Sequence, residues 1–308
     1  MHFYTMNDII LNRKKIVKFI DTNQKKRGKN TGYTSEQIHK VLGICDERLK
    51  AMILIYASTG IRLAALPTLR IKDLTEVSLD DNIKQKLYRI TIYEGYKEEY
   101  VTFCTPECYR AIEAYLSYRA RSGEVITQDS PLIREQFDQE SFRVKHAAKA
   151  VGIRTISKII RKQLIQGGIR EIEHVGIGNK EGSKMRKDVP LMHGFRKFFN
   201  TALMNADVHP SFKELLMGHS IKLDDVYYHK DSEKSRQKLL AEYCKALDTL
   251  TISEEDRLKL ENQQIKQRNE TLEKDKDEII LLRKELEPLL ALKTTLIKEG
   301  LLRETANS

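Results

Sequence analysis

Several polar side chains of this sequence belong to types that bind anions, transfer protons or act as nucleophiles. They are Arg62 in Ser58-Thr-Gly-Ile-Arg62, Lys97, His193 and Arg196 in His193-Gly-Phe-Arg196, His219 after Met217-Gly218, and the adjacent Tyr227 and Tyr228. Arginine carries a fixed charge and grips an oxyanion with paired hydrogen bonds. Imidazole titrates near neutral pH, and a phenol becomes a nucleophile once its proton is removed. Taken singly, each residue also fits an ordinary surface or core position, so only the set as a whole is informative.

The composition indicates a folded chain with a polyanionic partner. Of the 308 residues, 40% are hydrophobic and 32% are charged, which excludes collagen-like and wholly disordered chains. The net charge is +10, and residues 251–308 hold 11 basic and 13 acidic side chains, so the positive excess lies on the first 250 residues. Nucleic acid is the partner that such a balance favours. The longest apolar run, residues 51–57, is too short to cross a bilayer.

Composition also divides the chain into three parts. Residues 1–32 join a short apolar-periodic stretch to the basic run 24–30, which predicts a short helix and a basic linker. Residues 33–250 contain the periodic segments of a folded domain. Residues 251–308 are rich in Glu, Lys, Gln and Asn and predict a long helix.

Local signals predict how the main domain positions the polar residues. Thr34-Ser-Glu-Gln37 is a capping box at the start of a helix, and a second helix from about residue 46 to 58 should stop at Gly60. Residues 88–93 and 99–103 alternate apolar and polar side chains around a glycine-containing loop, which predicts a β-hairpin with Lys97 at its tip. Further helices are predicted at residues 107–120, 193–205, 210–217 and 233–248, and an exposed loop at 167–190. The expected fold class is therefore mainly α with a small antiparallel β-sheet (α+β).

The tail repeats apolar residues at intervals of seven. They are Leu258, Ile265, Leu272, Ile279 and Leu286. The companion positions are polar at Asn262 and Asn269, so a weak coiled coil and a single amphipathic helix lying on the main domain are both open. Pro288 should end or kink this helix.

The ordered set of blocks in residues 33–245 resembles the catalytic domain of the tyrosine recombinase (phage-type integrase) family, and archaeal integrases look closest. The matching blocks are Ser58-Thr-Gly-Ile-Arg62, His193-Gly-Phe-Arg196 and Met217-Gly-His-Ser220, with the tyrosine that follows. The spacings also fit, because 26 residues separate His193 from His219 and nine separate His219 from Tyr228. The resemblance implies the tyrosine recombinase catalytic-domain fold for residues 33–250.

The resemblance also implies a reaction in which DNA is cleaved and rejoined through a 3′-phosphotyrosine, with no metal, ATP or other cofactor. Arg62 and Arg196 would grip the non-bridging phosphate oxygens, because guanidinium forms paired hydrogen bonds that lysine cannot. His193 and His219 would add hydrogen bonds and relay the proton of the tyrosine. The partners implied are double-stranded DNA and further copies of the chain, as a tetramer on paired sites. The expected location is the cytoplasm, on the nucleoid and not at a membrane.

Two of these assignments leave alternatives open. Spacing favours Tyr228 as the nucleophile, but a difference of one residue in the loop would make it Tyr227. Lys97 is the candidate general acid because it is the only lysine in the hairpin loop, although Glu94 stands where the family usually has its lysine.

Other departures from the family pattern concern the whole chain. About thirty residues precede the catalytic domain, which suggests that residues 1–32 are the remnant of a core-binding domain. Ala65 replaces the usual acidic residue after Arg62, and Lys197 replaces a common histidine. These departures keep open a DNA-binding remnant of an integrase that no longer cleaves. A further alternative is an activity like that of type IB topoisomerases.

Overall fold

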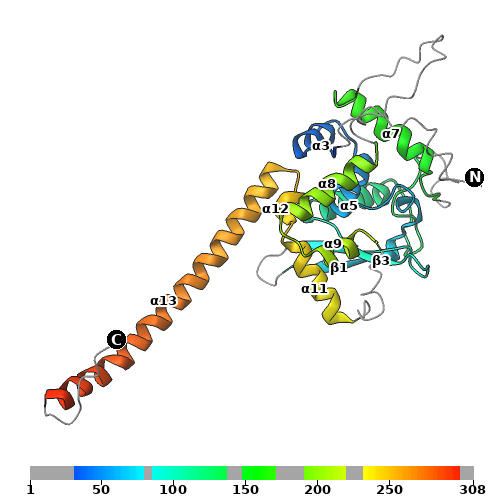
Figure 1. Cartoon of the computed structure of the whole chain (residues 1–308). Coiled ribbons are helices and arrows are strands. Elements are labelled where there is room, and N and C mark those ends of the chain that lie inside the picture. The colour runs from blue at the N-terminus through cyan, green and yellow to red at the C-terminus, as the bar shows by residue number, and fades with distance from the viewer. Residues whose placement is uncertain (1–30, 80–84, 137–147, 171–190, 220–231, 299–308) are drawn as a thin grey trace, which may run out of the picture.

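The computed structural model describes residues 31–79, 85–136, 148–170, 191–219 and 232–298. Over these residues the chain is mainly helical, and its strands form a three-stranded antiparallel sheet (Figure 1). This confirms the fold class expected from the sequence. The predicted helix within residues 1–32 lies outside the described residues, and so does most of the predicted loop at 167–190.

Among the described residues, the first helix begins where its capping box predicts, and the second begins and ends close to the predicted residues. At the start of α3 (Ser35–Leu42), the Thr34 side chain accepts the backbone N–H of Gln37, and the Gln37 side chain accepts the backbone N–H of Thr34. Helix α4 (Glu47–Thr59) ends at Gly60, whose φ of 60° is left-handed. The C-terminal two thirds of α4 are buried on all sides, so this helix is the centre of the domain.

The sheet is a meander in the order β1-β2-β3. The strands β2 (Lys86–Ile92) and β3 (Tyr100–Phe103) form the predicted hairpin, and Gly95 in its turn has a φ of 78°. The strand β1 (Leu74–Ser78) pairs antiparallel with β2 and was not predicted from the sequence. The hairpin turn and the residues that precede β1 therefore lie at neighbouring ends of one sheet.

The other helices of the domain pack around α4 and the sheet. They are α5 (Pro106–Arg121), α7 (Ile153–Gln166), α8 (His193–Asn205) and α9 (Pro210–Leu216), with the short 3-10 turns η1 (Leu66–Thr68) and η2 (Ile71–Asp73) between α4 and β1. Helix α4 packs against α5 and α8, while α9 lies against β3. The predicted helices in the regions of α5, α8 and α9 are confirmed.

The predicted helix over 233–248 is wrong in one respect, because the chain forms two helices there. They are α11 (Glu233–Cys244) and α12 (Leu247–Leu250). The break lets α11 pack against α9 while α12 packs against α8. The buried Tyr243 near the break donates its hydroxyl to the carbonyl of Ser58 at 2.9 Å, which ties this region to the end of α4.

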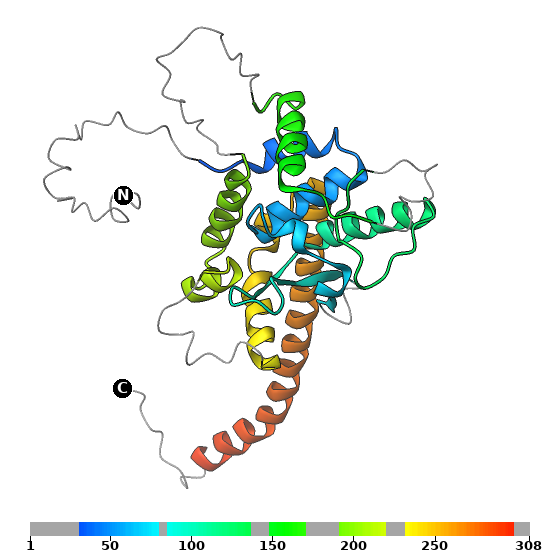
Figure 2. The ribbon, with the colours of Figure 1, turned by 90° about the vertical axis from the view of Figure 1, so that its right-hand side faces the viewer.

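The tail forms one long helix, α13 (Glu254–Lys298), which runs away from the domain in both views (Figures 1 and 2). The alternative of a helix lying on the main domain is therefore wrong. The helix also continues through Pro288 instead of ending there, since a carbonyl that loses its partner on an exposed helix can bond to water. Among the described helices, none is both long enough and apolar enough to cross a membrane.

Candidate functional site

Arg62 follows the turn that ends α4, and this turn is pressed against α8. A Cβ atom on Gly60 would lie 2.4 Å from the ring atom Cδ1 of Phe199, so no side chain fits there. The left-handed φ of Gly60 likewise favours glycine. The close contact of this turn with Phe199 brings the chain that leads to Arg62 against the helix that carries Arg196.

Arg196 is a buried cation held by backbone carbonyls. Its guanidinium donates from Nη1 to the oxygen of Gly60 and from Nη2 to the oxygen of Met217, each at 2.6 Å. Burial lowers the pKa of Arg196, but a guanidinium keeps its charge at any accessible pH. In the described part of the chain no carboxylate forms an ion pair with Arg196. A buried charge without a counterion is a favourable place for an anion.

Arg62 contacts the same turn. Its Nη2 makes a long hydrogen bond of 3.5 Å to the carbonyl oxygen of Gly218, next to the carbonyl of Met217 that Arg196 uses. Arg62 is exposed whereas Arg196 is buried. The two guanidinium groups thus converge on adjacent peptide carbonyls, one from within the domain and one at its surface.

His219 links Arg196 to a carboxylate that the sequence did not indicate. Its Nε2 lies 2.8 Å from Nη2 of Arg196, and its Nδ1 lies 2.5 Å from Oε2 of Glu214. Because a guanidinium can only donate, Nε2 accepts and Nδ1 carries the proton. Burial raises the pKa of the Glu214 carboxyl, but the hydrogen bonds from His219 and Lys213 and the charge of Lys213 outweigh it, so the pKa is lowered. Glu214 therefore orients the ring of His219 toward Arg196.

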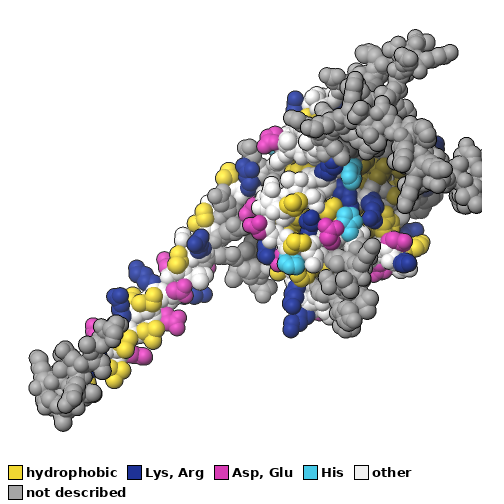
Figure 3. All heavy atoms as spheres, in the orientation of Figure 1, with side chains coloured by type: hydrophobic (Ala, Val, Ile, Leu, Met, Phe, Trp, Pro, Cys, Tyr) yellow, Lys and Arg dark blue, Asp and Glu magenta, His cyan; other side chains and the backbone are white. Residues whose placement is uncertain are grey.

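His193 is the first residue of α8 and stands three residues before Arg196. Burial lowers the pKa of His193, and the positive charges of Lys197 and Arg196 lower it further, which favours the neutral imidazole. Figure 3 shows histidine side chains beside basic and acidic ones on the face that carries α8 and α9. A neutral imidazole in such a field can accept a proton from a hydroxyl group.

Tyr100 is a second residue that the sequence did not indicate. A Cβ atom on Gly218, whose φ is 64°, would lie 2.4 Å from Cε1 of the Tyr100 ring. Among the described residues the buried Tyr100 hydroxyl has no hydrogen bond partner of regular geometry, although it lies near Arg196 and Arg62. Burial raises the pKa of Tyr100 to about 12, against the opposing effect of both arginines. The hydroxyl therefore stays protonated and can donate to an anion.

A pocket of about 870 Å³ opens beside Arg62. Lys72 and Glu94 both line it, and Lys72 Nζ lies 3.4 Å from Oε2 of Glu94. Lys97 lies on the exposed turn between β2 and β3 and is not among the residues of the pocket wall. The hairpin residues that line the pocket are Tyr93, Glu94, Tyr96 and Glu98, so the hairpin presents two acids and no lysine to it, and Lys97 as the general acid stays a prediction.

The described residues bring Arg62, Arg196 and His219 together. Tyr227 and Tyr228 lie outside the described residues, so the choice between them stays a prediction. In the part of the chain that the structure describes, no group of three or more His, Cys, Asp or Glu side chains is arranged to hold a metal ion.

The comparison of sequences shows to which family a chain with this fold belongs. The sequence profile of the Phage integrase family matches residues 33–234, about two thirds of the chain. The chain therefore belongs to the phage integrase family, whose members are site-specific tyrosine recombinases. This confirms the resemblance inferred from the sequence blocks, whereas the closer similarity to archaeal integrases stays a prediction.

Comparison with curated proteins found no match. Among solved structures, the chain is similar to the XerA recombinase, at 18% identity and a TM-score of 0.43 over 78% of this chain and 71% of that one. It is similar to the integrase of mycobacterium phage Brujita, at 16% identity and a TM-score of 0.46 over 81% and 68%. It is also similar to the XerH recombinase bound to its difH substrate, at 17% identity and a TM-score of 0.43 over 65% of this chain and 50% of that one.

Proposed function

We propose that this chain is a site-specific recombinase that cleaves and rejoins double-stranded DNA through a 3′-phosphotyrosine on Tyr228. The observation that carries the proposal is the convergence of Arg62 and Arg196 on the adjacent carbonyls of Gly218 and Met217. Two guanidinium groups meet at one turn, and among the described residues no carboxylate forms an ion pair with Arg196. This arrangement suits paired hydrogen bonds to the oxygen atoms of one phosphate.

In the proposed reaction the two guanidinium groups stabilise the charge that develops on the non-bridging oxygens of the pentavalent transition state. Preorganised cations in a site of low dielectric act more strongly than the same groups in water. Once the phosphate displaces His219 from Arg196, the lone pair of its Nε2 is free, while its Nδ1–H keeps donating to Glu214. Nε2 of His219, or His193, can then receive the proton of the tyrosine, and a protonated Nε2 can donate a hydrogen bond to a phosphate oxygen.

The phosphotyrosine ester conserves the energy of the cleaved phosphodiester bond, which makes the cleavage step reversible. The 5′-hydroxyl of a second strand can attack the phosphorus and release the tyrosine, so strands are exchanged without ATP. A general acid must protonate the departing 5′-oxygen in the forward direction. Lys97 is the residue predicted for this task from the sequence.

The DNA partner is inferred from charge. The positive excess of the chain lies on the first 250 residues, the part that holds Arg62 and Arg196. Each phosphate that the protein neutralises releases counterions, so we expect binding to weaken steeply with salt. Recombination also requires several copies on paired sites, and a chromosomal target would keep the protein at the nucleoid.

Helix α13 is proposed to mediate self-association. Its heptad residues are about half exposed: Leu258, Ile265, Leu272, Ile279 and Leu286. Pairing with a second copy would bury this stripe, so the double change Leu272→Lys and Ile279→Lys should shift the full chain toward monomer. Sedimentation velocity measures this, and Leu281→Lys, exposed but off the stripe, is the control. Equal oligomeric states for all three proteins would rule out pairing through α13.

The catalytically defective DNA-binding protein remains the second candidate. Glu94 in the pocket beside Arg62 favours it, because a carboxylate there repels a phosphate and engages Lys72. The two candidates differ in one product, a covalent bond between the protein and DNA.

Covalent trapping separates these candidates. Duplexes are selected from a random library for binding to the chain and then nicked near the selected centre, so that the short fragment released by cleavage diffuses away. The recombinase is expected to form an adduct that survives denaturant and disappears with protease. Tight binding with no adduct at any salt concentration would support the defective protein. Relaxation of supercoiled plasmid by monomeric protein would instead indicate activity like that of a type IB topoisomerase.

A further inference from the structure

Lys72 lines the same pocket as Arg62, and the mechanism above gives it no task. It stands in η2, ahead of β1, and so enters the pocket from a different element than the hairpin that carries Lys97. Among the described residues that line the pocket, Lys72 is the only lysine.

The backbone at Lys72 is fixed by a neighbouring segment. The N–H of Lys72 donates to the carbonyl of Gln128 at 2.9 Å, and the N–H of Ile71 donates to the carbonyl of Ser130 at 3.1 Å. Two consecutive hydrogen bonds of this kind hold the turn in one place. The backbone from which the Lys72 side chain extends into the pocket is therefore held in a fixed position.

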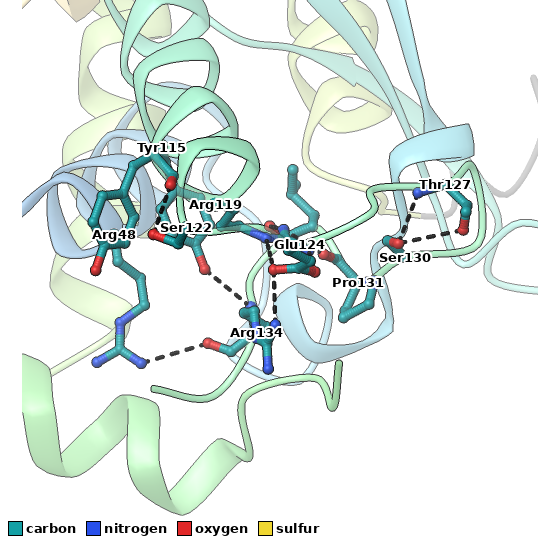
Figure 4. A network of polar contacts seen from close by, with 11 residues as sticks. Arg48, Tyr115, Arg119, Ser122, Glu124, Thr127, Ser130, Pro131 and Arg134 are labelled. Carbon is teal, nitrogen blue, oxygen red and sulfur yellow. Dashed lines mark hydrogen bonds and ion pairs between the residues drawn. The ribbon is translucent and has the colours of Figure 1, made fainter. Parts of the chain in front are cut away.

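That segment is itself anchored by a buried ionic network, which Figure 4 shows from close by. Glu124 accepts hydrogen bonds from Arg119 at 2.6 and 3.0 Å and from Arg134 at 2.7 Å, and all three side chains are buried. Arg119 also donates to the carbonyl of Pro131 at 2.9 Å. Breaking such a network would leave an uncompensated buried charge, so the segment that supports Lys72 is held firmly.

Without DNA, the partner of Lys72 is Glu94, at 3.4 Å. The two side chains are 46% and 52% exposed, and an ion pair as exposed as this one is weak. A phosphate held by Arg62 can therefore compete with Glu94 for the ammonium group. Glu94 keeps Lys72 in the pocket, and the compact ammonium with its three rotatable protons can turn toward an oxygen atom.

We propose that Lys72 is the general acid that protonates the departing 5′-oxygen, an inference that rests on the proposed function. The phenolic oxygen of Tyr228 forms a bond to phosphorus while the bond from phosphorus to the 5′-oxygen breaks and its electron pair stays on that oxygen. A proton passes from Nζ of Lys72 to the same oxygen, which leaves as a hydroxyl group. The neutral amine of Lys72 takes the proton back when a 5′-hydroxyl attacks the phosphotyrosine.

DNA with a sulfur atom in place of the bridging 5′-oxygen at the cleaved phosphate tests this role, because a thiolate leaves without being protonated. On all-oxygen DNA, Lys72→Ala should form the covalent adduct about 100-fold more slowly than the wild-type chain. On the sulfur DNA its rate should return to within about threefold of wild type. Lys72→Arg should behave in the same way, because a guanidinium holds its proton too tightly to give it up.

Lys86→Ala is the matched control. Lys86 is as exposed as Lys72, and it likewise forms an ion pair with a glutamate, Glu76 on the neighbouring strand, at 2.7 Å. It should react like wild type on both DNAs. An unchanged rate for Lys72→Ala on all-oxygen DNA overturns the role, as does a slow rate that sulfur does not restore. The role of Lys72 is also overturned if the sulfur DNA restores the rate of Lys97→Ala and not that of Lys72→Ala. If the wild-type chain forms no adduct with either DNA, the proposed function itself fails, and the role of Lys72 with it.

Discussion

An Arg196→Ala variant is expected to form the covalent adduct about a thousandfold more slowly than the wild-type chain, since one preorganised donor in an active site contributes about 10²–10³ in rate. The guanidinium is buried and fixed by the carbonyls of Gly60 and Met217, so it needs no rearrangement to meet the transition state. The single-turnover rate of adduct formation on the nicked duplex measures the loss.

Two further variants separate the chemistry of Arg196 from its structural role. Arg196→Lys keeps the charge but not the paired hydrogen bonds, and should still be slower than wild type by about 100-fold. Arg110→Ala removes an arginine that pairs with Asp256 at the base of α13, 2.7 Å away, and should leave the rate within about twofold because exposed ion pairs are weak. A folded Arg196→Ala protein that cleaves at the wild-type rate would contradict the phosphate-binding role.

Gly218→Ala should damage both the stability and the site. A left-handed backbone costs a non-glycine residue about 1–2 kcal/mol, and the new Cβ would lie 2.4 Å from the Tyr100 ring, so we expect a loss on the order of 3 kcal/mol in the free energy of unfolding. The carbonyls that hold Arg62 and Arg196 belong to this turn, so the cleavage rate should also fall by about 100-fold. Urea denaturation and the adduct assay measure the two effects.

The hairpin offers a matched control for this glycine. Gly95 has a φ of 78°, but a Cβ atom added to it would meet nothing within 4 Å, so Gly95→Ala should cost only about 1–2 kcal/mol and leave cleavage intact. Because Tyr100→Ala removes the clash, the double variant Gly218→Ala with Tyr100→Ala should lose less stability than the sum of the losses in the two single variants. Equal losses in Gly218→Ala and Gly95→Ala would show that the contact with Tyr100 has no consequence.

Turns and helix ends could be predicted from the sequence because their signals are local. The capping residues Thr34 and Gln37 are three positions apart, and Gly60 follows directly on the helix it ends. The hairpin from residue 88 to 103 also carries its own signal, because the alternation of side chains and the glycine in the loop lie within one short segment.

Features that depend on distant contacts could not be predicted in this way. The strand β1 exists through its pairing with β2, and the break between α11 and α12 follows from the two different helices against which they pack. Glu214 stands five residues before His219, a spacing with no regular period, and Tyr100 is recognised only through its contact with Gly218. The path of α13 away from the domain likewise has no local cause, since an amphipathic stripe fits either a partner helix or the body of the protein.

The convergence of Arg62 and Arg196 lies between these two cases. Nothing in the intervening sequence predicts that they meet, and the expectation came from the resemblance of the ordered blocks to a known family. The structure adds the physical reason, which is the contact of the Gly60 turn with Phe199 and the shared use of the Met217–Gly218 carbonyls.

The identity of the amino acid bound to DNA tests most directly the claim that one phosphate meets both arginines and a tyrosine. The trapped wild-type adduct is digested with protease and nuclease, and mass spectrometry locates the nucleotide on the peptide. We predict attachment at Tyr228, with the adduct lost in Tyr228→Phe and kept in Tyr227→Phe. Attachment at any other residue, Tyr227 included, would contradict the account.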